Sequence, residues 1–253
     1  MLSAFYPSGA VRAIFRGALL GKASGVSLVK NFEYEVYRLK LEIAELHRLK
    51  LDLSELVKFA LLIEDASFYQ HRGISLRGIA RAFWGLLTGK RRGGGSTITQ
   101  QLARAQFIVR PRNNFRRKLV EVLLALWVER CFTKQEILEG YLATARFERG
   151  VYGFHRAYRH FFLDRPLNIQ SWEAFILVER LGNIRSRFLG RRVRQLLIKA
   201  INAKAISVED AKEGLLFYEQ FIGHHFVPIS GEPSPAEIIA EIDLLSTNAV
   251  SKT

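Results

Sequence analysis

Apolar residues along this chain recur mainly at helical spacing. In the stretch from Leu53 to Ile63 they fall three and four residues apart, which places them on one face of a helix. Asp52 and Glu55 stand where a capping box would start this helix, and Glu64 stands at its end. The apolar residues that carry the period are Leu56, Phe59, Ala60 and Ile63.

The rest of the chain repeats this helical pattern. Apolar residues predict a helix over residues 114–130, and Thr133 with Glu136 predicts the start of the next one. Strand signals are scarce, and the best are residues 107–109 and 226–228. We therefore expect a mainly α-helical protein. Further helix starts are predicted at Ser171, at Ser207 with Asp210, and at Ser234-Pro235 with Glu237.

Composition indicates the class of protein, and net charge indicates the charge of its binding partners. With 253 residues and 49% hydrophobic content the chain can bury a sizeable core, which excludes disorder of the whole chain. Its net charge is +14, so the favoured partners are anionic: nucleic acid, anionic lipid or a phosphorylated substrate. No nucleic-acid-binding motif accompanies this charge. The single cysteine, Cys131, allows no internal disulfide.

Two basic segments are candidates for contact with a membrane surface. Arg12, Arg16 and Lys22 interrupt the first, so no transmembrane helix is predicted, and no export signal is evident. Residues 11–30 are predicted either as an amphipathic helix on a membrane or as an ordinary first helix. Residues 77–92 interleave apolar and aromatic side chains with Arg and Lys, which favours a membrane-facing segment.

Two glutamates have sequence surroundings that suit chemistry. Glu64 follows three apolar residues, which would suit its carboxyl group to proton transfer; the alternative is a solvated side chain at a helix end. Glu121 shares a predicted helix face with Arg117 and Lys118. These three residues form either a surface ion-pair cluster or an inward cluster that holds a diphosphate or a divalent cation.

A glycine run at 93–95 precedes Ser96 and Thr97 but lacks the spacing of a P-loop. Glycines before small hydroxyl residues at a helix start can still present backbone N–H groups to an anion, and a surface loop is the alternative. His71 is either a ligand or base or a structural residue, since no second His or Cys stands at metal spacing around it. No G-x-S-x-G sequence supports nucleophilic hydrolase chemistry.

Four stretches occur in an order that is typical of one enzyme family. They are Glu64-Asp65-x-x-Phe68-x-x-His71-x-Gly73, then Gly95-Ser96-Thr97-Ile98-Thr99-Gln100-Gln101, then Arg117-Lys118-x-x-Glu121, and finally Lys134-x-x-Ile137-Leu138-Glu139-x-Tyr141-Leu142. Together they make the chain resemble glycosyltransferase family 51, the peptidoglycan glycosyltransferase of penicillin-binding proteins and of monofunctional transglycosylases. The resemblance covers roughly residues 50 to 200.

The resemblance implies a lysozyme-like helical domain with a large lobe and a small membrane-facing jaw. It also implies a reaction in which the 4-hydroxyl of lipid II attacks the anomeric carbon of a growing glycan on undecaprenyl diphosphate. Inversion then gives a β-1,4 linkage. The expected catalytic residues are Glu64, as general base, and Glu121. With Arg117 and Lys118, Glu121 would steady the leaving diphosphate, and Mg²⁺ or Mn²⁺ at Glu121 is the candidate cofactor.

The same resemblance implies binding residues, partners and a location. The partners would be lipid II and polyprenyl-diphosphate-linked glycan, the membrane surface and cell-wall synthesis proteins, with no nucleic acid. The location would be the outer, periplasmic face of the bacterial cell membrane, with peripheral attachment. The expected substrate-binding residues are Asp65, Phe68, His71, Ser96, Thr97, Gln100, Gln101, Arg104, Arg117 and Lys118.

We expect three segments and a single activity. Residues 1–45 are predicted as an N-terminal helical, membrane-associating segment, 46–205 as the glycosyltransferase-like domain and 206–253 as a C-terminal helical extension. This length leaves no room for a transpeptidase domain, so we expect a monofunctional enzyme.

The chain departs from the family pattern at supporting positions. Asparagine is usual where Ala105 and Ala143 stand, and an aromatic followed by glycine is usual where Phe147-Glu148 stands. The usual Glu-Ala-Ala-x-Leu-Ala-Gly-Leu becomes Glu173-Ala174-Phe175-Ile176-Leu177-Val178-Glu179-Arg180-Leu181, and Arg192 to Leu197 is a loose fifth motif. Two alternatives therefore stand beside an active enzyme: a catalytically degenerate scaffold that binds glycan strands or cell-wall partners, and a lysozyme-like hydrolase.

Overall fold

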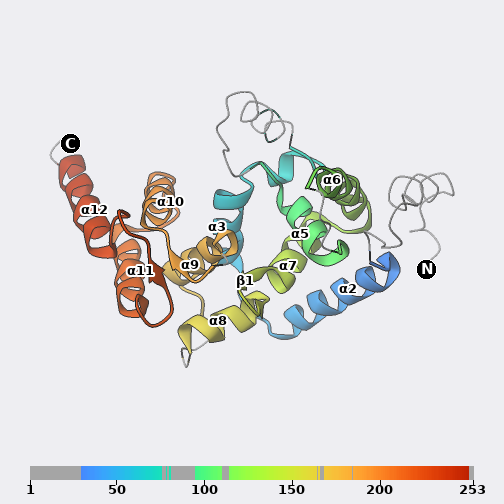
Figure 1. Ribbon diagram of the computed structural model, residues 1–253, viewed down its shortest axis with the longest axis horizontal. Coiled ribbons are helices and arrows are strands. Elements are labelled where there is room, and N and C mark those ends of the chain that lie inside the picture. The colour runs from blue at the N-terminus through green and yellow to red at the C-terminus, as the bar shows by residue number, and fades with distance from the viewer. Residues whose placement is uncertain are drawn as a thin grey trace. The chain divides into compact units, whose positions relative to one another are not determined.

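The computed structural model shows a chain built mainly of helices (Figure 1). In the part of the chain that it describes, strands are limited to two short pairs. The mainly α-helical fold class is therefore confirmed. The structure describes residues 30–75, 78, 80, 95–109, 114–163, 165, 168–183 and 185–250, without the side chains of 114–116 and 245–250.

Several predictions fall outside these residues. The amphipathic helix predicted over 11–30 lies outside them except for Lys30, and the jaw predicted over 77–92 lies outside them except for residues 78 and 80. Of the glycine run, only Gly95 is described. Within the described ranges, no helix combines the length and the hydropathy needed to span a bilayer.

The chain divides into two compact units, each built from two separate stretches. The first unit comprises the described residues up to Leu49 together with Ser67–Thr144. The second comprises Lys50–Ala66 together with the described residues from Ala145 onward. The three consecutive segments predicted with boundaries after residues 45 and 205 stay a prediction.

This division separates the residues of the first motif. Glu64 and Asp65 belong to the second unit, whereas Phe68 and His71 belong to the first. Residues that are adjacent in the sequence motif are therefore held by two different cores.

The first unit is a group of helices packed around α5. Its elements are α2 (Phe32–Arg48), the 3-10 turn η2 (Phe68–Gln70), α5 (Ile98–Phe107), α6 (Asn114–Cys131) and α7 (Lys134–Thr144). Helix α5 packs against α2, α6 and α7, and α2 also packs against α7. The last contact is close because α7 has glycine at position 140, where a Cβ would lie 2.9 Å from Leu39 Cδ1 of α2. Leu39 is fully buried in this contact.

The second unit is built around α9 (Ser171–Gly182), in which every residue from Trp172 to Leu181 is buried. Helix α9 packs against α3 (Ser54–Glu64), α8 (Phe154–Phe162) and α11 (Val208–Phe221). The other helices are α10 (Gly190–Asn202) and α12 (Pro235–Val250). Strand β1 (Arg146–Glu148) pairs antiparallel with β2 (Val151–Tyr152), and β3 (Arg187–Phe188) pairs parallel with β4 (Val227–Pro228).

Local sequence predicted several helix starts correctly. The Thr133 N–H donates to Glu136 Oε2 at 2.7 Å before α7, as a capping box requires. The Ser207 hydroxyl accepts the Asp210 N–H at 2.9 Å and caps α11. Ser234 accepts from the Glu237 N–H in the same way at the start of α12.

The capping box predicted from Asp52 and Glu55 is wrong. Helix α3 begins at Ser54, whose N–H donates to Asp52 Oδ1 at 2.9 Å. The Glu55 carboxylate lies instead against the Lys58 ammonium and accepts a hydrogen bond from the Ser171 hydroxyl of α9. Ser171, which is distant in the sequence, therefore binds the Glu55 carboxylate that local spacing had assigned to the helix cap.

The helix start predicted at Ser171 is confirmed, since α9 begins there; its cap is Gln170, which forms a capping box with Glu173. Residues 107–109 were predicted as a strand, but Phe107 is the last residue of α5. The other strand prediction, 226–228, contains β4.

Glu173 places a carboxylate in the core of the second unit. It accepts hydrogen bonds from the Tyr158 hydroxyl at 3.1 Å and from the Gln170 N–H at 3.0 Å, and it lies 3.4 Å from Arg165 Nη1. Burial outweighs these contacts and raises the pKa of Glu173 above its ordinary value. Burial, with the neighbouring Glu173 charge, raises the pKa of Tyr158 to about 12.

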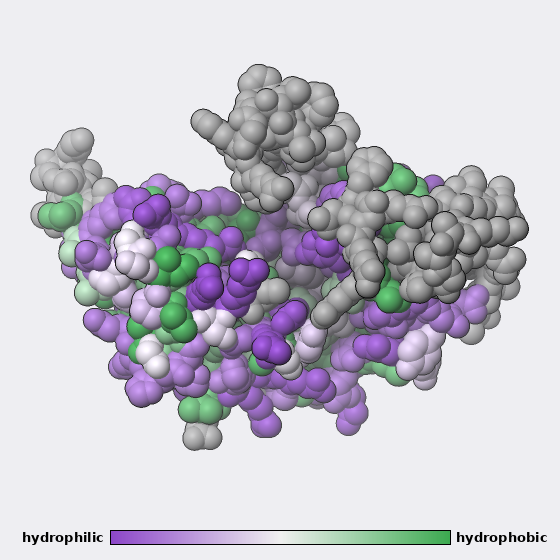
Figure 2. All heavy atoms as spheres, in the orientation of Figure 1, coloured by the Kyte–Doolittle hydropathy of each residue, from purple (hydrophilic) through white to green (hydrophobic). Residues whose placement is uncertain are grey.

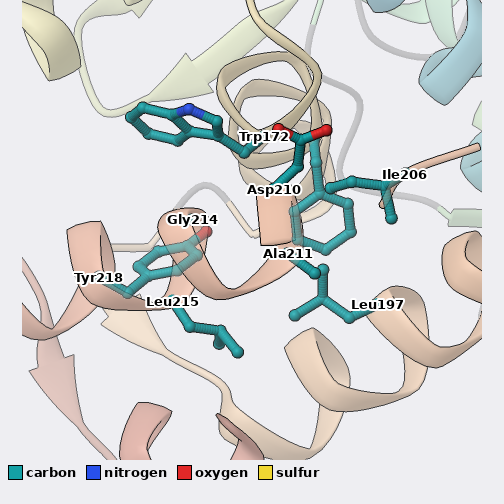
Figure 3. A pocket seen from close by; sticks show the side chains of 9 residues that line it. Trp172, Leu197, Ile206, Asp210, Ala211, Gly214, Leu215 and Tyr218 are labelled. Carbon is teal, nitrogen blue, oxygen red and sulfur yellow. The ribbon is translucent and has the colours of Figure 1, made fainter. Parts of the chain in front are cut away.

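A small gap lies where α9, α10 and α11 meet, with Trp172, Leu197 and Gly214 on its walls (Figure 3). It has no room for a water molecule, so it is a packing gap and not a ligand site. On the face seen in Figure 2, hydrophobic residues over the C-terminal helices lie in small groups among hydrophilic ones.

The packing of Gly214 predicts that Gly214→Ala stabilises the protein. A new Cβ would meet Trp172 Cβ at 3.4 Å, an ordinary contact. Alanine in a helix is favoured over glycine by roughly 0.5–1 kcal/mol, so the free energy of unfolding should rise by about that amount. The matched control is Gly190→Ala, whose Cβ would lie 1.9 Å from the Pro233 carbonyl oxygen and should be destabilising. Urea unfolding measures both, and a loss of stability in Gly214→Ala would contradict the prediction.

Glu173 predicts a pH dependence of stability. Because its pKa is higher in the folded protein than the ordinary value of 4.5, the folded state binds this proton more tightly than the unfolded state. Its contribution to stability is therefore present below pH 4.5 and is lost as pH rises through the raised pKa. Glu173→Gln removes this loss and keeps an acceptor for the cap. Thermal unfolding should show the variant gaining on the wild type as pH rises above 4.5, whereas a constant difference would contradict this account.

Candidate functional site

Glu121 is the centre of a charged cluster in the first unit. Its side chain is 1% exposed, on the face of α6 that packs inward. Arg117 Nε lies 3.3 Å from Glu121 Oε1, Lys118 Nζ lies 3.3 Å from Oε2, and Arg104 Nη1 of α5 lies 3.9 Å from Oε1. The burial of Glu121 favours the inward arrangement of this helix face, whereas the binding of a diphosphate or a cation there stays a prediction.

This cluster has a net positive charge, because three cations surround one carboxylate. The side chains of Arg117, Lys118 and Arg104 are 35%, 44% and 44% exposed, so each keeps part of its charged surface open to a ligand. The buried carboxylate attracts the three cations to one place, while their excess positive charge favours an anion. The arrangement suits a group with several negative oxygens.

Lys118 joins this cluster to the second motif. Its ammonium donates to Ser96 Oγ at 2.8 Å and to Gln100 Oε1 at 3.1 Å, in addition to its contact with Glu121. Helices α5 and α6 lie side by side, which brings these side chains together (Figure 1). The structure therefore assembles Ser96, Gln100, Lys118 and Glu121 from positions up to 25 residues apart.

Thr97 and Gln100 also start α5. The Thr97 hydroxyl accepts the Gln100 N–H at 3.1 Å, and Gln100 Oε1 accepts the Thr97 N–H at 3.3 Å, which completes a capping box. The Thr97 hydroxyl also donates to the Gly73 carbonyl at 2.7 Å. Thr97 is buried in these contacts, so its described interactions orient the helix that carries Gln100 and Arg104.

The Gly73 backbone fits against α6. Its φ is +81°, and an added Cβ would lie 2.9 Å from the Ala125 carbonyl oxygen. Glycine is therefore required on both conformational and steric grounds. Close to it in sequence, Phe68 is buried beneath the Lys134 ammonium, which lies 4.2 Å from the ring centre, and His71 meets the ring edge of Phe68. Gln101 accepts a hydrogen bond from the Tyr141 hydroxyl at 3.1 Å.

The residues around Glu121 do not fit a protein-built site for a divalent cation. Mg²⁺ and Mn²⁺ prefer several oxygen ligands, and here a single carboxylate is already paired with cations. In the described part of the chain, no group of three or more His, Cys, Asp or Glu side chains is arranged so that it could hold a metal ion. Metal dependence of the activity therefore stays a prediction.

Glu64 ends α3 in the second unit, and its side chain is 15% exposed. Arg192 of α10 lies beside it, with Nη2 at 3.9 Å from Glu64 Oε1. Asp65, the next residue, is buried at the C-terminal cap of the same helix. The only sequence signal for Arg192 is its place in the loose fifth motif. That Glu64 and Glu121 serve one active site stays a prediction.

Glu148 has a visible packing role. One of its carboxylate oxygens accepts from the Ser186 hydroxyl, and the other lies 3.0 Å from His160 Nε2 of α8. Glu148 is buried, so these contacts stabilise β1 against its neighbours. Ala143 is half-buried on α7, and Ala105 is exposed on α5.

Known proteins are similar to this chain over the region that contains the sequence motifs. A protein-family model described as "Transglycosylase" matches residues 34–187. A biosynthetic peptidoglycan transglycosylase of Thiobacillus denitrificans is 36% identical over 144 residues, which are 54% of this chain and 61% of that protein. Penicillin-binding protein 1F of Bacillus subtilis is 37% identical over 118 residues, 46% of this chain and 16% of that protein.

These relatives extend beyond the matched part. Penicillin-binding protein 4 of Bacillus subtilis is 42% identical over 108 residues, which are 42% of this chain but 17% of that protein. The chain thus spans less than two thirds of the length of the relatives it matches. The family model nevertheless covers more than half of the chain, including all four sequence motifs. The resemblance to glycosyltransferase family 51 is confirmed: this chain belongs to the transglycosylase family.

Proposed function

We propose that this protein is a peptidoglycan glycosyltransferase that polymerises lipid II, with Glu64 as the general base. The observation that carries the proposal is the buried Glu121 carboxylate, which holds three part-exposed cations next to Ser96 and Gln100. Such a cluster suits the diphosphate that leaves in this reaction. The family match supplies the reaction class.

The reaction makes one bond and breaks one bond at the anomeric carbon of the donor. The acceptor 4-hydroxyl oxygen bonds to this carbon, and its proton passes to the Glu64 carboxylate. The bond from the same carbon to the diphosphate oxygen breaks on the opposite side, so the configuration inverts. Undecaprenyl diphosphate leaves with the bonding electrons.

The cations around Glu121 would stabilise the charge that develops on the leaving diphosphate. Arg104, Arg117 and Lys118 provide donors whose directions are fixed before the substrate arrives, and fixed donors stabilise developing charge better than water does. In this proposal Glu121 holds these donors in place. Its burial supports that role, because a side chain that is 1% exposed has little surface for a substrate to touch.

The remaining parts of the proposal concern location and partners. A diphosphate carried on a polyprenyl chain is presented at a bilayer, so we place the protein peripherally on the outer, periplasmic face of the bacterial membrane. The net charge of +14 supports attachment to an anionic surface. Cell-wall synthesis proteins are the proposed protein partners, and nucleic acid is not among them.

A degenerate scaffold that binds glycan without turnover is the second candidate. The observation that favours it is Glu148, whose carboxylate is taken up by Ser186 and His160 at a position where the family usually has glycine. Binding of lipid II without polymer formation would select it. Release of soluble fragments from purified cell wall would instead indicate a lysozyme-like hydrolase.

Glu64→Gln tests the general base. Removing the group that accepts the hydroxyl proton should lower the rate of lipid II polymerisation by roughly 10²–10⁴-fold. The matched control is Glu219→Gln, an exposed glutamate on α11 in the same unit, which should polymerise like the wild type. Gel analysis of glycan strands gives the rate, and equal polymer from Glu64→Gln and wild type would refute the assignment.

Lys118→Met tests the diphosphate cluster. Methionine keeps the length of the side chain but removes the ammonium that contacts Ser96, Gln100 and Glu121. We expect kcat/KM to fall by at least about tenfold and inhibition by inorganic diphosphate to weaken, because both depend on this charge. Lys40→Met, an exposed lysine on α2, is the control. Unchanged inhibition by diphosphate in Lys118→Met would place the leaving group elsewhere.

A further inference from the structure

Glu179 is a fully buried carboxylate at a position where the family pattern has small and apolar residues. Its Oε2 accepts a hydrogen bond from the Tyr218 hydroxyl at 2.8 Å, and its Oε1 accepts one from Asn183 Nδ2 at 3.2 Å. Two guanidinium groups complete its surroundings: Arg180 Nη1 at 3.7 Å from Oε2 and Arg192 Nε at 3.4 Å from Oε1. A charge removed from water is stable only with such partners.

Arg192 connects this buried carboxylate to the candidate base. Its Nε faces Glu179 and its Nη2 faces Glu64 Oε1 at 3.9 Å, so one planar group spans two carboxylates. Signs of charge alternate along the series from Arg180 through Glu179 and Arg192 to Glu64. All four side chains belong to the second unit.

Gly182 makes room for the Arg192 guanidinium. It is the last residue of α9, and a Cβ at this position would lie 2.0 Å from Arg192 Nη2 and 2.8 Å from Cζ. Gly182 is exposed and is not in the left-handed region of φ, so its backbone accommodates alanine. A methyl group there would displace the Arg192 guanidinium without removing any charged residue from the protein.

Tyr218 anchors the network from α11. It is fully buried (Figure 3 shows it beside the gap between α9 and α11), and burial raises the pKa of Tyr218 well above its ordinary value, with the Glu179 charge adding to the rise. Its hydroxyl therefore stays protonated and donates to Glu179 at every pH at which the protein would work. Helix α11 lies beyond residue 187, where the match to the family model ends.

We propose that Glu179, held by Tyr218, is a positioning residue that fixes Arg192 beside Glu64 and so orients the carboxylate that takes the acceptor proton. This inference rests on the proposed function of Glu64 as base. Through Tyr218 of α11, the C-terminal region of the chain would then contribute to catalysis. Proton transfer depends steeply on geometry, and misplacement of a reacting group by about 1 Å can cost on the order of 10²-fold in rate.

The main test compares Gly182→Ala with Gly214→Ala in the full-length protein. Gly182→Ala should lower kcat for lipid II polymerisation by about tenfold or more, with KM within about twofold of the wild type. Because Arg192 is also a partner of the buried Glu179, its displacement should lower Tm as well. Gly214→Ala is the matched control in the same unit, because its Cβ makes ordinary contacts away from Arg192, and its kcat should equal that of the wild type. Both variants are assayed well below their Tm, where a merely structural loss would not change kcat per folded molecule. A wild-type kcat for Gly182→Ala under these conditions would overturn the proposal.

Tyr218→Phe tests the anchor with almost no change in volume. It removes the hydroxyl that donates to Glu179, and kcat should fall by about threefold to tenfold at constant KM. On a Glu64→Gln background neither substitution should lower the residual rate further, because both act through Glu64. Additive losses on that background would overturn the proposal.

The outcomes separate this inference from the function on which it rests. Wild-type kcat in both Gly182→Ala and Tyr218→Phe, with Glu64→Gln inactive, overturns the positioning role and leaves the base in place. Full activity of Glu64→Gln overturns the assigned base. No polymer from the wild-type protein overturns both.

Discussion

A carboxylate withdrawn from water must be met by cations or hydrogen-bond donors, and this requirement organises both units of the protein. In the first unit, Glu121 draws Arg104 and two neighbours on its own helix into one cluster. In the second, Glu173 and Glu179 are satisfied by residues from several elements that pack around α9. Each buried carboxylate can be satisfied only by the residues that pack against it. These charged groups therefore restrict which helices can lie next to one another within each unit.

The same requirement explains why the candidate site consists of cations with fixed directions. A lysine or arginine on an open surface samples many rotamers, and ordering it on binding costs free energy. Around Glu121 part of that ordering is made before a ligand arrives, because the buried carboxylate lies within 3.9 Å of each cation. The exposed side of the cluster is then available to an anion whose charge grows during a reaction.

The departures from the family pattern follow this physical logic. Glu148 introduces a buried carboxylate, and Ser186 and His160 satisfy it. Glu179 introduces another, and its partners include Tyr218 from a helix beyond the family match. Each added charge is accompanied by residues that compensate for it, which is the pattern of a folded core that has been adapted and not of one that has lost its packing.

The sequence by itself determined the elements and the family. Helical periodicity, the caps at Ser207 and Ser234, and the shared face of Arg117, Lys118 and Glu121 are local properties, since each depends on residues within one or two turns. Motif order also identified the family, although the roles of Glu64 and the other site residues stay predictions.

Only the tertiary structure decided which side chains meet across long separations in the sequence. It placed Arg192 beside Glu64, Lys118 against Ser96, and Ser171 against Glu55, where local spacing had predicted a capping box. It also divided the first motif between two cores, with the boundary after Ala66. The physical reason is that periodicity specifies which face of a helix is buried, whereas the partner of a buried charge depends on which other helix packs there.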